Sequence, residues 1–250
     1  MRNIKLVLEY DGTNYHGWQT QPDLPTIQDT IEEALAQLTK TPIKIIGAGR
    51  TDTGVHAEGQ VANFGTDSQI PVAAFQKGLN AILPRDIVVC SATEVSPEFH
   101  SRFSATSRRY RYTILNRAYP SALSRQTSYF FPAPIGVPRA NTLCQILIGK
   151  RDFSSFQKTG SDRINPICEI YEGSCWQKDP YVYFEIEADA FLRGMVRAIV
   201  GTILKCIKED NAEAELHRIL DAKDRAAAGT SAPAHGLSLI CVKYNNGLHL

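Results

Sequence analysis

The sequence predicts an α+β fold built from two α/β domains, each with a mixed, largely antiparallel sheet flanked by helices. Two observations support this. Segments with apolar residues at every second position, as in strands, are interleaved in both halves with segments of helical apolar spacing. The 250 residues are 43% hydrophobic, which suffices for two cores of ordinary size. We place the domains at residues 1–104 and 105–250.

The first half is expected to form two helices and four strands. Its first strand alternates apolar and polar side chains, and its first helix opens on Thr26 and Asp29, which are placed as a capping box. In chain order we expect a strand at 3–10, a helix at 26–38, strands at 42–46 and 58–64, a helix around 71–82 and a strand around 86–93.

The second half repeats this mixture of strands and helices after a proline-rich stretch at 120–138. Its most apolar segment, AFLRGMVRAIVGTILKCI, is predicted to be a long helix. In chain order we expect a strand at 107–116, a helix near 139–148, strands at 167–175 and 181–188, helices at 190–207 and near 211–222, and a strand at 237–244.

Composition narrows the classes of function. The chain has 27 basic and 26 acidic residues, and a net charge of +1 does not by itself indicate nucleic-acid binding. Only a local cluster of basic residues could indicate it. The six cysteines are scattered without a Cys-x-x-Cys pair, which favours reduced core thiols over disulfides or a zinc site. No apolar run is long enough to span a bilayer, and the first residues lack a signal-peptide pattern. We therefore expect a cytoplasmic protein without a membrane segment.

The most informative stretch is GAGRTDTGVHAEG, residues 47–59, with Asp52 at its centre. A dinucleotide-binding fingerprint fits at Gly47 and Gly49 but would place the Asp52 carboxylate against the phosphates. A phosphate-binding loop of the G-x-x-x-x-G-K-[ST] type lacks its lysine and hydroxyl here. Glu58 is a weak candidate for a glycosidase-like carboxylate pair. The plain alternative is that Asp52 caps a turn whose glycines permit tight backbone geometry.

A second informative segment is basic. FHSRFSATSRRYRYTILNR, residues 99–117, holds five arginines and no acid. On a strand, Arg109 and Arg111 share one face and Tyr110 lies on the other. Guanidinium groups for phosphates and aromatic rings for stacking suit looped RNA, which makes these three residues candidates for substrate binding. The alternative is that this segment is an edge strand without a binding role, whose arginines are solvated and whose tyrosines pack in the core.

The expected apolar helix carries two arginines, Arg193 and Arg197, one turn apart. An arginine drawn into a core needs an anion, because burying an unpaired charge is costly. Glu187 or Asp189 could supply it for Arg197. For Arg193 the more interesting partner is Asp52, since an ion pair would keep that carboxylate ionised.

Together these segments resemble the tRNA pseudouridine synthase A family (the TruA family) over the whole chain. The resemblance is carried, in family order, by YDGTNYHGWQ, TIQDTIEEAL, GAGRTDTGVHA, LNAILP, FHSRFSATSRRYRY, DFSSF, AFLRGMVR and AAAGTSAPAHGL. GRTD-x-GVHA is the most specific of them. Thr53 is a small departure, since alanine is commoner in the family at that position.

The resemblance implies an isomerase that converts uridine to pseudouridine at positions 38, 39 and 40 in the anticodon arm of tRNA. It further implies a homodimer without metal or organic cofactor, with the active-site cleft between the two domains. By this resemblance Asp52 is the nucleophile, Tyr110 stacks on the flipped uracil, and Arg193 pairs with Asp52. Arg50 resembles a residue that occupies the space left by the flipped base.

Two questions stay open at the level of sequence. Asp52 could add to C1′ of the ribose or to C6 of the uracil. The main alternative from another class of function is a non-catalytic tRNA-binding protein or chaperone. Such a protein would keep the Arg–Tyr strand but has no use for an intact GRTD-x-GVHA motif together with Arg193, so the enzyme is favoured.

Overall fold

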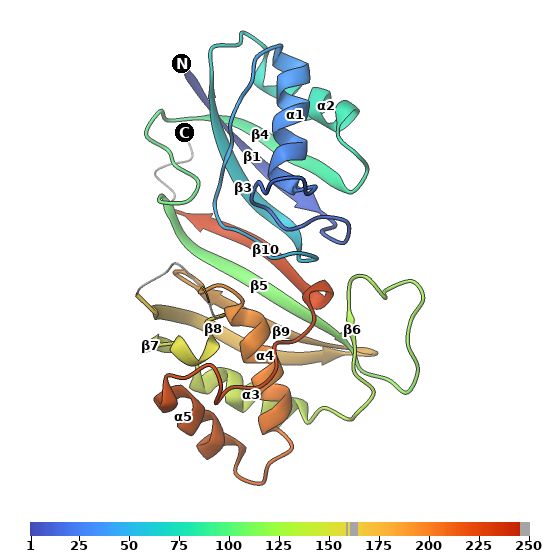
Figure 1. Ribbon diagram of the computed structural model, residues 1–250, viewed down its shortest axis with the longest axis vertical. Coiled ribbons are helices and arrows are strands. Elements are labelled where there is room, and N and C mark those ends of the chain that lie inside the picture. Colours follow the sequence, from blue (N-terminus) through green and yellow to red (C-terminus); the bar gives the residue numbers. More distant parts are fainter. Residues whose placement is uncertain (159, 161–164, 246–250) are drawn as a thin grey trace. The chain divides into compact units, whose positions relative to one another are not determined.

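The computed structural model describes residues 1–158, 160 and 165–245 (Figure 1). The chain forms two compact units, and the division falls between Arg108 and Arg109 and again between Leu237 and Ser238. The first unit therefore contains the N-terminal part and the segment that begins at Ser238, and the second contains everything between. The expected boundary after residue 104 lies shortly before this division, and the assignment of the units as functional domains stays a prediction.

The first unit is built on a sheet with the strand order β4-β1-β3-β10. Strand β1 is antiparallel to β3 and β4, whereas β10 is parallel to β3 and the short β2 is antiparallel to it. Helices α1 and α2 pack against each other, and α2 packs against β4. These elements are β1 (Arg2–Tyr10), α1 (Ile27–Thr39), β2 (Ile46–Gly47), β3 (His56–Thr66), α2 (Val72–Ile82), β4 (Ile87–Val95) and β10 (Leu237–Tyr244).

Helix α1 shows how closely local sequence determines this unit. Its N-cap is Thr26, whose hydroxyl oxygen accepts a hydrogen bond from the backbone N–H of Asp29 at 3.2 Å. This is the expected helix start. Ile27, Ile31 and Leu35 are fully buried at helical spacing, so one face of α1 belongs to the core.

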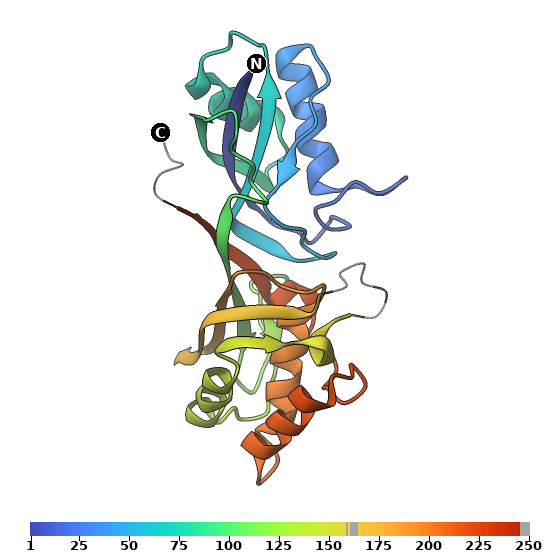
Figure 2. The ribbon, with the colours of Figure 1, turned by 90° about the vertical axis from the view of Figure 1, so that its left-hand side faces the viewer.

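The strands of the second unit follow the order β5-β9-β8-β7, with β6 parallel to β5; β5 itself begins shortly before the division between the units. Strands β7, β8 and β9 are antiparallel neighbours. Helix α3 packs on β8 and contacts α4 and α5, and Figures 1 and 2 show the three helices gathered on one side of the sheet. These elements are β5 (Ala105–Leu115), β6 (Tyr129–Phe130), α3 (Val137–Ile146), β7 (Gly149–Asp152), β8 (Ile167–Lys178), β9 (Tyr181–Ala188), α4 (Met195–Cys206) and α5 (Ala212–Ala222).

The α+β class with mixed, largely antiparallel sheets is thus confirmed, with two local corrections. The strand expected at 42–46 is wrong except for Ile46, because the Glu32 carboxylate accepts the backbone N–H of Ile45 at 3.1 Å and takes that donor away from a ladder. The long helix expected from residue 190 begins only at Met195, after Gly194 with a φ of +71°. Among the described residues, no helix is long and apolar enough to cross a membrane.

Candidate active site

Asp52 lies in the loop between β2 and β3 and opens a tight turn. The backbone N–H of Val55 donates to the carbonyl oxygen of Asp52 at 3.1 Å, which closes a four-residue turn. The third residue of that turn, Gly54, has a φ of +75°, the region that a type II turn requires and that favours glycine. The motif therefore holds a half-buried carboxylate on a backbone of defined geometry.

The loop DGTNYHGW, residues 11–18, holds this turn through backbone hydrogen bonds. The N–H of Trp18 donates to the carbonyl oxygen of Thr51 at 3.1 Å, and the N–H of Gly54 donates to that of Tyr15 at 3.4 Å. Asp52 is thus bracketed on both sides by residues whose backbones are tied to the same neighbouring loop. The sequence contained this loop as a motif but gave it no role.

Two glycines let the backbones of these loops touch. A Cβ atom at Gly12 would lie 2.1 Å from the carbonyl oxygen of Val55. One at Gly17, which has a φ of +88°, would lie 2.5 Å from the carbonyl oxygen of Thr51. Since both obstacles are backbone atoms, no side-chain rearrangement could relieve the contact.

Side chains fasten the turn further. The hydroxyls of Tyr10 and Thr51 share a buried hydrogen bond of 2.9 Å. His56 accepts the N–H of Gly12 on Nδ1 at 3.1 Å, and the same ring nitrogen lies 3.1 Å from the Asp11 carboxylate. Burial raises the pKa of Asp11, but hydrogen bonds from Thr13 and the interaction with His56 outweigh it and hold that pKa below its usual range. His56 therefore helps to hold the structure of the turn.

The other end of the loop is anchored just as firmly. Gln60 is fully buried and donates from Nε2 to the carbonyl oxygen of Gly49 at 2.9 Å. Arg108 donates to the carbonyl oxygens of Ala48 and Arg102, at 2.9 and 2.7 Å. Part of the basic segment therefore supports the loop that carries Asp52, a role that the sequence did not predict.

Arg50 stands on the surface beside this turn. Its side chain is exposed, and its Nε donates to the amide oxygen of Gln19 at 3.1 Å. A residue that inserts into a nucleic acid needs a long, exposed side chain, and Arg50 has one only two residues from Asp52. Its substrate-binding role stays a prediction.

In the second unit, Tyr110 lies on β5 and is 8% exposed. Its ring meets Phe191 edge-on, with centroids 5.0 Å apart and an interplanar angle of 84°. Phe191 belongs to the turn that leads into α4 and also carries Arg193. Tyr110 and this turn are therefore neighbours, which brings two of the three expected catalytic segments into one region of the unit.

Arg193 differs from the expectation in its setting. It precedes α4 and is exposed, and its carbonyl oxygen accepts the N–H of Lys158 at 2.9 Å. Arg197 alone lies on the helix, and its Nε donates to the carbonyl oxygen of Ala232 at 2.7 Å. The expectation that the apolar helix draws both arginines into the core is wrong for Arg193, because the helix begins only after Gly194, the residue that follows Arg193 in the chain. Its pairing with Asp52, which belongs to the first unit, stays a prediction.

Arg109 and Arg111 are bound to carboxylates of neighbouring strands. Arg109 contacts Glu187 at 2.6 Å and Glu172 at 2.5 Å, and Arg111 contacts Glu185 at 2.6 Å. Both arginines share one face of β5, as expected, and the acids of β9 lie on the same face of the sheet. A phosphate would compete with these acids, so a substrate-binding role for the two arginines stays a prediction.

Comparisons with known proteins agree on one family. The family described as tRNA pseudouridine synthase matches residues 6–104 and 143–245 of this chain. The chain therefore belongs to the tRNA pseudouridine synthase family. In the described part of the chain, no three His, Cys, Asp or Glu side chains gather as metal ligands would.

Individual relatives carry a more specific name. A Thermoanaerobacter sp. (strain X514) protein named tRNA pseudouridine synthase A is 43% identical over 98% of this chain and 100% of its own. A protein of the same name from Acetivibrio thermocellus is 45% identical over the same shares of the two chains. A chain of a solved Cbf5-Nop10-Gar1 complex overlaps 94% of this chain and 57% of its own, at 11% identity and a TM-score of 0.34.

Proposed function

We propose that this chain isomerises uridine to pseudouridine at positions 38, 39 and 40 in the anticodon arm of tRNA, with Asp52 as the nucleophile. As a member of the family it is an isomerase. The observation that carries the assignment of Asp52 is its turn, which a glycine of positive φ shapes and which a second loop holds on both sides. Such anchoring is what a nucleophile needs in order to meet one atom of a bound nucleotide.

The reaction breaks the N1–C1′ glycosidic bond, turns the base and rejoins it to the ribose through C5. A carboxylate of Asp52 can hold one fragment covalently and so divide a difficult step into two easier ones. The proton on C5 leaves, N1 takes up a proton, and Asp52 is released unchanged. We leave open whether the covalent bond forms at C1′ of the ribose or at C6 of the uracil.

Three further residues complete the proposed site. Tyr110, in edge contact with Phe191, would stack on the flipped uracil and take part in removing the C5 proton. The exposed guanidinium of Arg193 would pair with Asp52 and keep it ionised. Arg50, exposed beside the turn, would occupy the space that the flipped base leaves.

We also propose that the enzyme works as a homodimer in the cytoplasm, where its tRNA substrate is found. The support for both is similarity to the curated relatives over nearly their full length. A non-catalytic tRNA-binding protein is the alternative. It has no need of a carboxylate held on a glycine-shaped turn, which is why we favour the enzyme.

Pseudouridine mapping in cellular tRNA tests the proposal. We expect pseudouridine at positions 38–40 in cells with the gene, none there in cells without it, and restoration by the wild-type gene. A gene encoding Asp52→Ala should not restore it. Unchanged pseudouridine after removal of the gene would contradict the proposed substrate, unless a second enzyme is shown to act at the same positions.

A further inference from the structure

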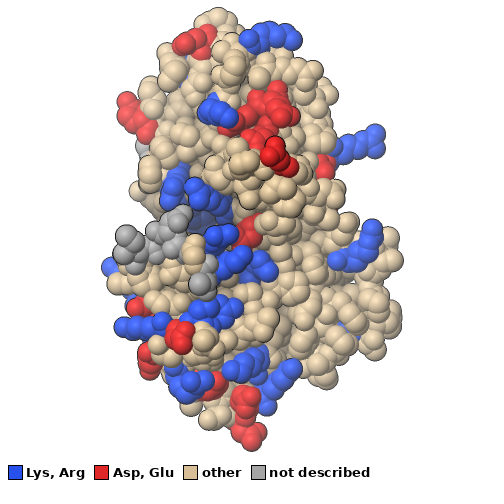
Figure 3. Space-filling model, in the orientation of Figure 1, with Lys and Arg blue, Asp and Glu red and all other residues tan. Residues whose placement is uncertain are grey.

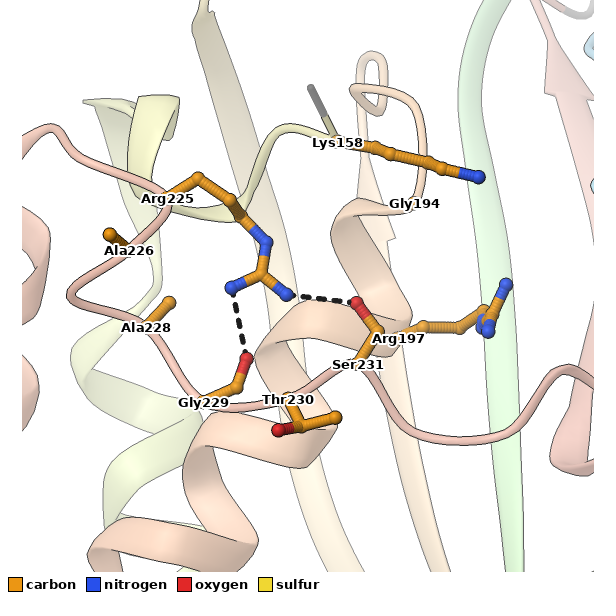
Figure 4. Close-up of a pocket in the computed structure, with 9 residues that line it drawn as sticks. All are labelled: Lys158, Gly194, Arg197, Arg225, Ala226, Ala228, Gly229, Thr230 and Ser231. Carbon is orange, nitrogen blue, oxygen red and sulfur yellow. Dashed lines mark hydrogen bonds between the residues drawn. The ribbon is translucent and has the colours of Figure 1, made fainter. Parts of the chain in front are cut away.

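The pocket beside α4 in the second unit belongs to the site already described. It is lined by Gly194, which directly follows Arg193, and by the loop in which Arg225 donates to the Ser231 hydroxyl at 3.0 Å (Figure 4). Figure 3 shows Lys and Arg side chains gathered over the helical part of this unit, with a few acidic side chains among them. Both features extend the basic surroundings of Arg193. The first unit holds a different feature, a buried polar contact directly beside Asp52.

Two buried hydroxyl groups meet next to the turn that Asp52 opens. Tyr10 is 3% exposed, and Thr51, the residue before Asp52, is 6% exposed. Their hydroxyl oxygens lie 2.9 Å apart and share a hydrogen bond. Because Thr51 and Asp52 are adjacent in the chain, this bond ties the neighbour of the proposed nucleophile to the sheet.

Tyr10 is a fixed point of the first unit. It is the last residue of β1, and its backbone pairs with Ala57 of β3 on one side and with Ile87 of β4 on the other. Its ring packs against Trp18, with centroids 6.1 Å apart. Pairing on both sides together with a buried ring leaves the Tyr10 hydroxyl little freedom, so its bond passes the position of the sheet on to Thr51.

Trp18 closes a ring of contacts around this bond. Its side chain packs on Tyr10, and its backbone N–H donates to the carbonyl oxygen of Thr51 at 3.1 Å. Thr51 is therefore held twice, at its backbone by Trp18 and at its side chain by Tyr10. The two contacts restrain both the place of the turn and its rotation about the chain.

Stability alone does not account for two hydroxyl groups at this place. Replacing both partners of a buried hydrogen bond with apolar groups of the same shape is close to neutral for stability. Phe and Val differ little in shape from Tyr and Thr, so an apolar pair would fill the same space. The apolar pair would lack direction, because a hydrogen bond requires a defined orientation of both groups and apolar contact does not.

We propose that Tyr10 and Thr51 are positioning residues for Asp52, and that their hydrogen bond sets the direction in which the turn presents the Asp52 carboxylate. The proposal rests on the proposed function, in which Asp52 is the nucleophile. The pair acts through Asp52 and not on the substrate, and it adds a side-chain restraint to the backbone contacts of the 11–18 loop.

The test separates position from stability with Tyr10→Phe, Thr51→Val and the variant that combines them. Each single variant leaves one hydroxyl without this partner and should unfold at a lower temperature, whereas the combined variant should regain most of that loss. Single-turnover pseudouridine formation at saturating tRNA should still be roughly tenfold slower in the combined variant, with unchanged tRNA affinity. Thr51→Ser, which keeps the hydroxyl, should keep the wild-type rate.

Tyr244→Phe is the matched control. Tyr244 is a buried tyrosine of the same unit, and its hydroxyl donates to the carbonyl oxygen of Ser101 at 2.8 Å. This variant should unfold at a lower temperature and keep the wild-type rate. A wild-type rate in the combined variant would overturn the proposal. An equal loss of rate in Tyr244→Phe would do the same, because the rate would then follow stability and not position.

Amide hydrogen exchange at Val55 reports on the turn without any need for turnover. The Val55 N–H closes the turn on the carbonyl oxygen of Asp52, and it should exchange faster in Tyr10→Phe and Thr51→Val than in the wild-type protein or Tyr244→Phe. Unchanged exchange in both variants would overturn the proposal. If the wild-type protein forms no pseudouridine while exchange responds as expected, the proposed function fails and the hold of this pair on the turn stands.

Discussion

Replacing Gly17 with alanine tests whether the 11–18 loop positions Asp52, the proposed nucleophile. The new Cβ would lie 2.5 Å from the carbonyl oxygen of Thr51, whereas ordinary contact begins at 3.4 Å, so the two backbones must separate by the difference, 0.9 Å. A misplacement of about 1 Å at a reacting group can cost roughly 100-fold in rate, and we expect a loss of that order in single-turnover pseudouridine formation.

The same substitution should also reduce stability, because the φ of Gly17 is +88°. An L-residue with a side chain pays about 1–2 kcal/mol in the left-handed region, before any clash is counted. Gly136→Ala is the control, since its Cβ would meet only Arg139, at 3.9 Å, and it should alter neither rate nor unfolding temperature. A Gly17→Ala protein with a rate within about threefold of the wild-type rate would refute the idea that this loop sets the position of Asp52.

Substitutions at Asp52, Arg193, Arg109, Arg111 and Asp11 test the roles assigned to these side chains. Asp52→Asn and Arg193→Ala should each abolish most single-turnover activity, because the two residues would serve one step. The double variant should therefore be little worse than either single variant, and additive losses would show that the two residues act independently. Arg109→Ala and Arg111→Ala should lower the unfolding temperature, because each removes a close ion pair with a carboxylate of β9. Each should change the salt slope of tRNA binding by about one only if the arginine also contacts phosphate. The pKa of Asp11 is held below its usual value of 3.8 in the folded state, so its contribution to stability is present above pH 3.8 and is lost as the pH falls through the lower folded value. Asp11→Asn should therefore destabilise the protein more at pH 7 than at pH 3, measured by thermal unfolding at both pH values.

Much of the fold was predictable because local rules and tertiary structure agree along most of the chain. Helix α1 is the clearest case, since Thr26 caps it and its apolar stripe is the buried face. The two wrong element boundaries result from a hydrogen bond and from a backbone conformation that the apolar pattern does not show. The backbone N–H of Ile45 donates to the Glu32 carboxylate and not to a neighbouring strand. The apolar run that predicts one long helix is interrupted at Gly194, whose φ is positive.

The sequence singles out candidate site residues, whose roles stay predictions, but it does not show their surroundings. Asp52 could be singled out because its motif fits no phosphate-binding pattern and resembles the family's motif, whereas the role of Gly17 depends on a contact with Thr51 far along the chain. The partners of Arg109 and Arg111 follow from strand neighbours that no single segment encodes. Residue type and spacing predict the candidate site residues, whereas their contact partners depend on how distant segments pack.

The most direct test of the central claim is pseudouridine formation by purified protein on a tRNA that lacks the modification at positions 38–40. The wild-type protein should convert uridine there, while Asp52→Asn, which keeps the size of the side chain, should bind the tRNA with similar affinity and form no detectable pseudouridine. Measurable product from purified Asp52→Asn or Asp52→Ala protein would contradict the assignment of Asp52 as the nucleophile.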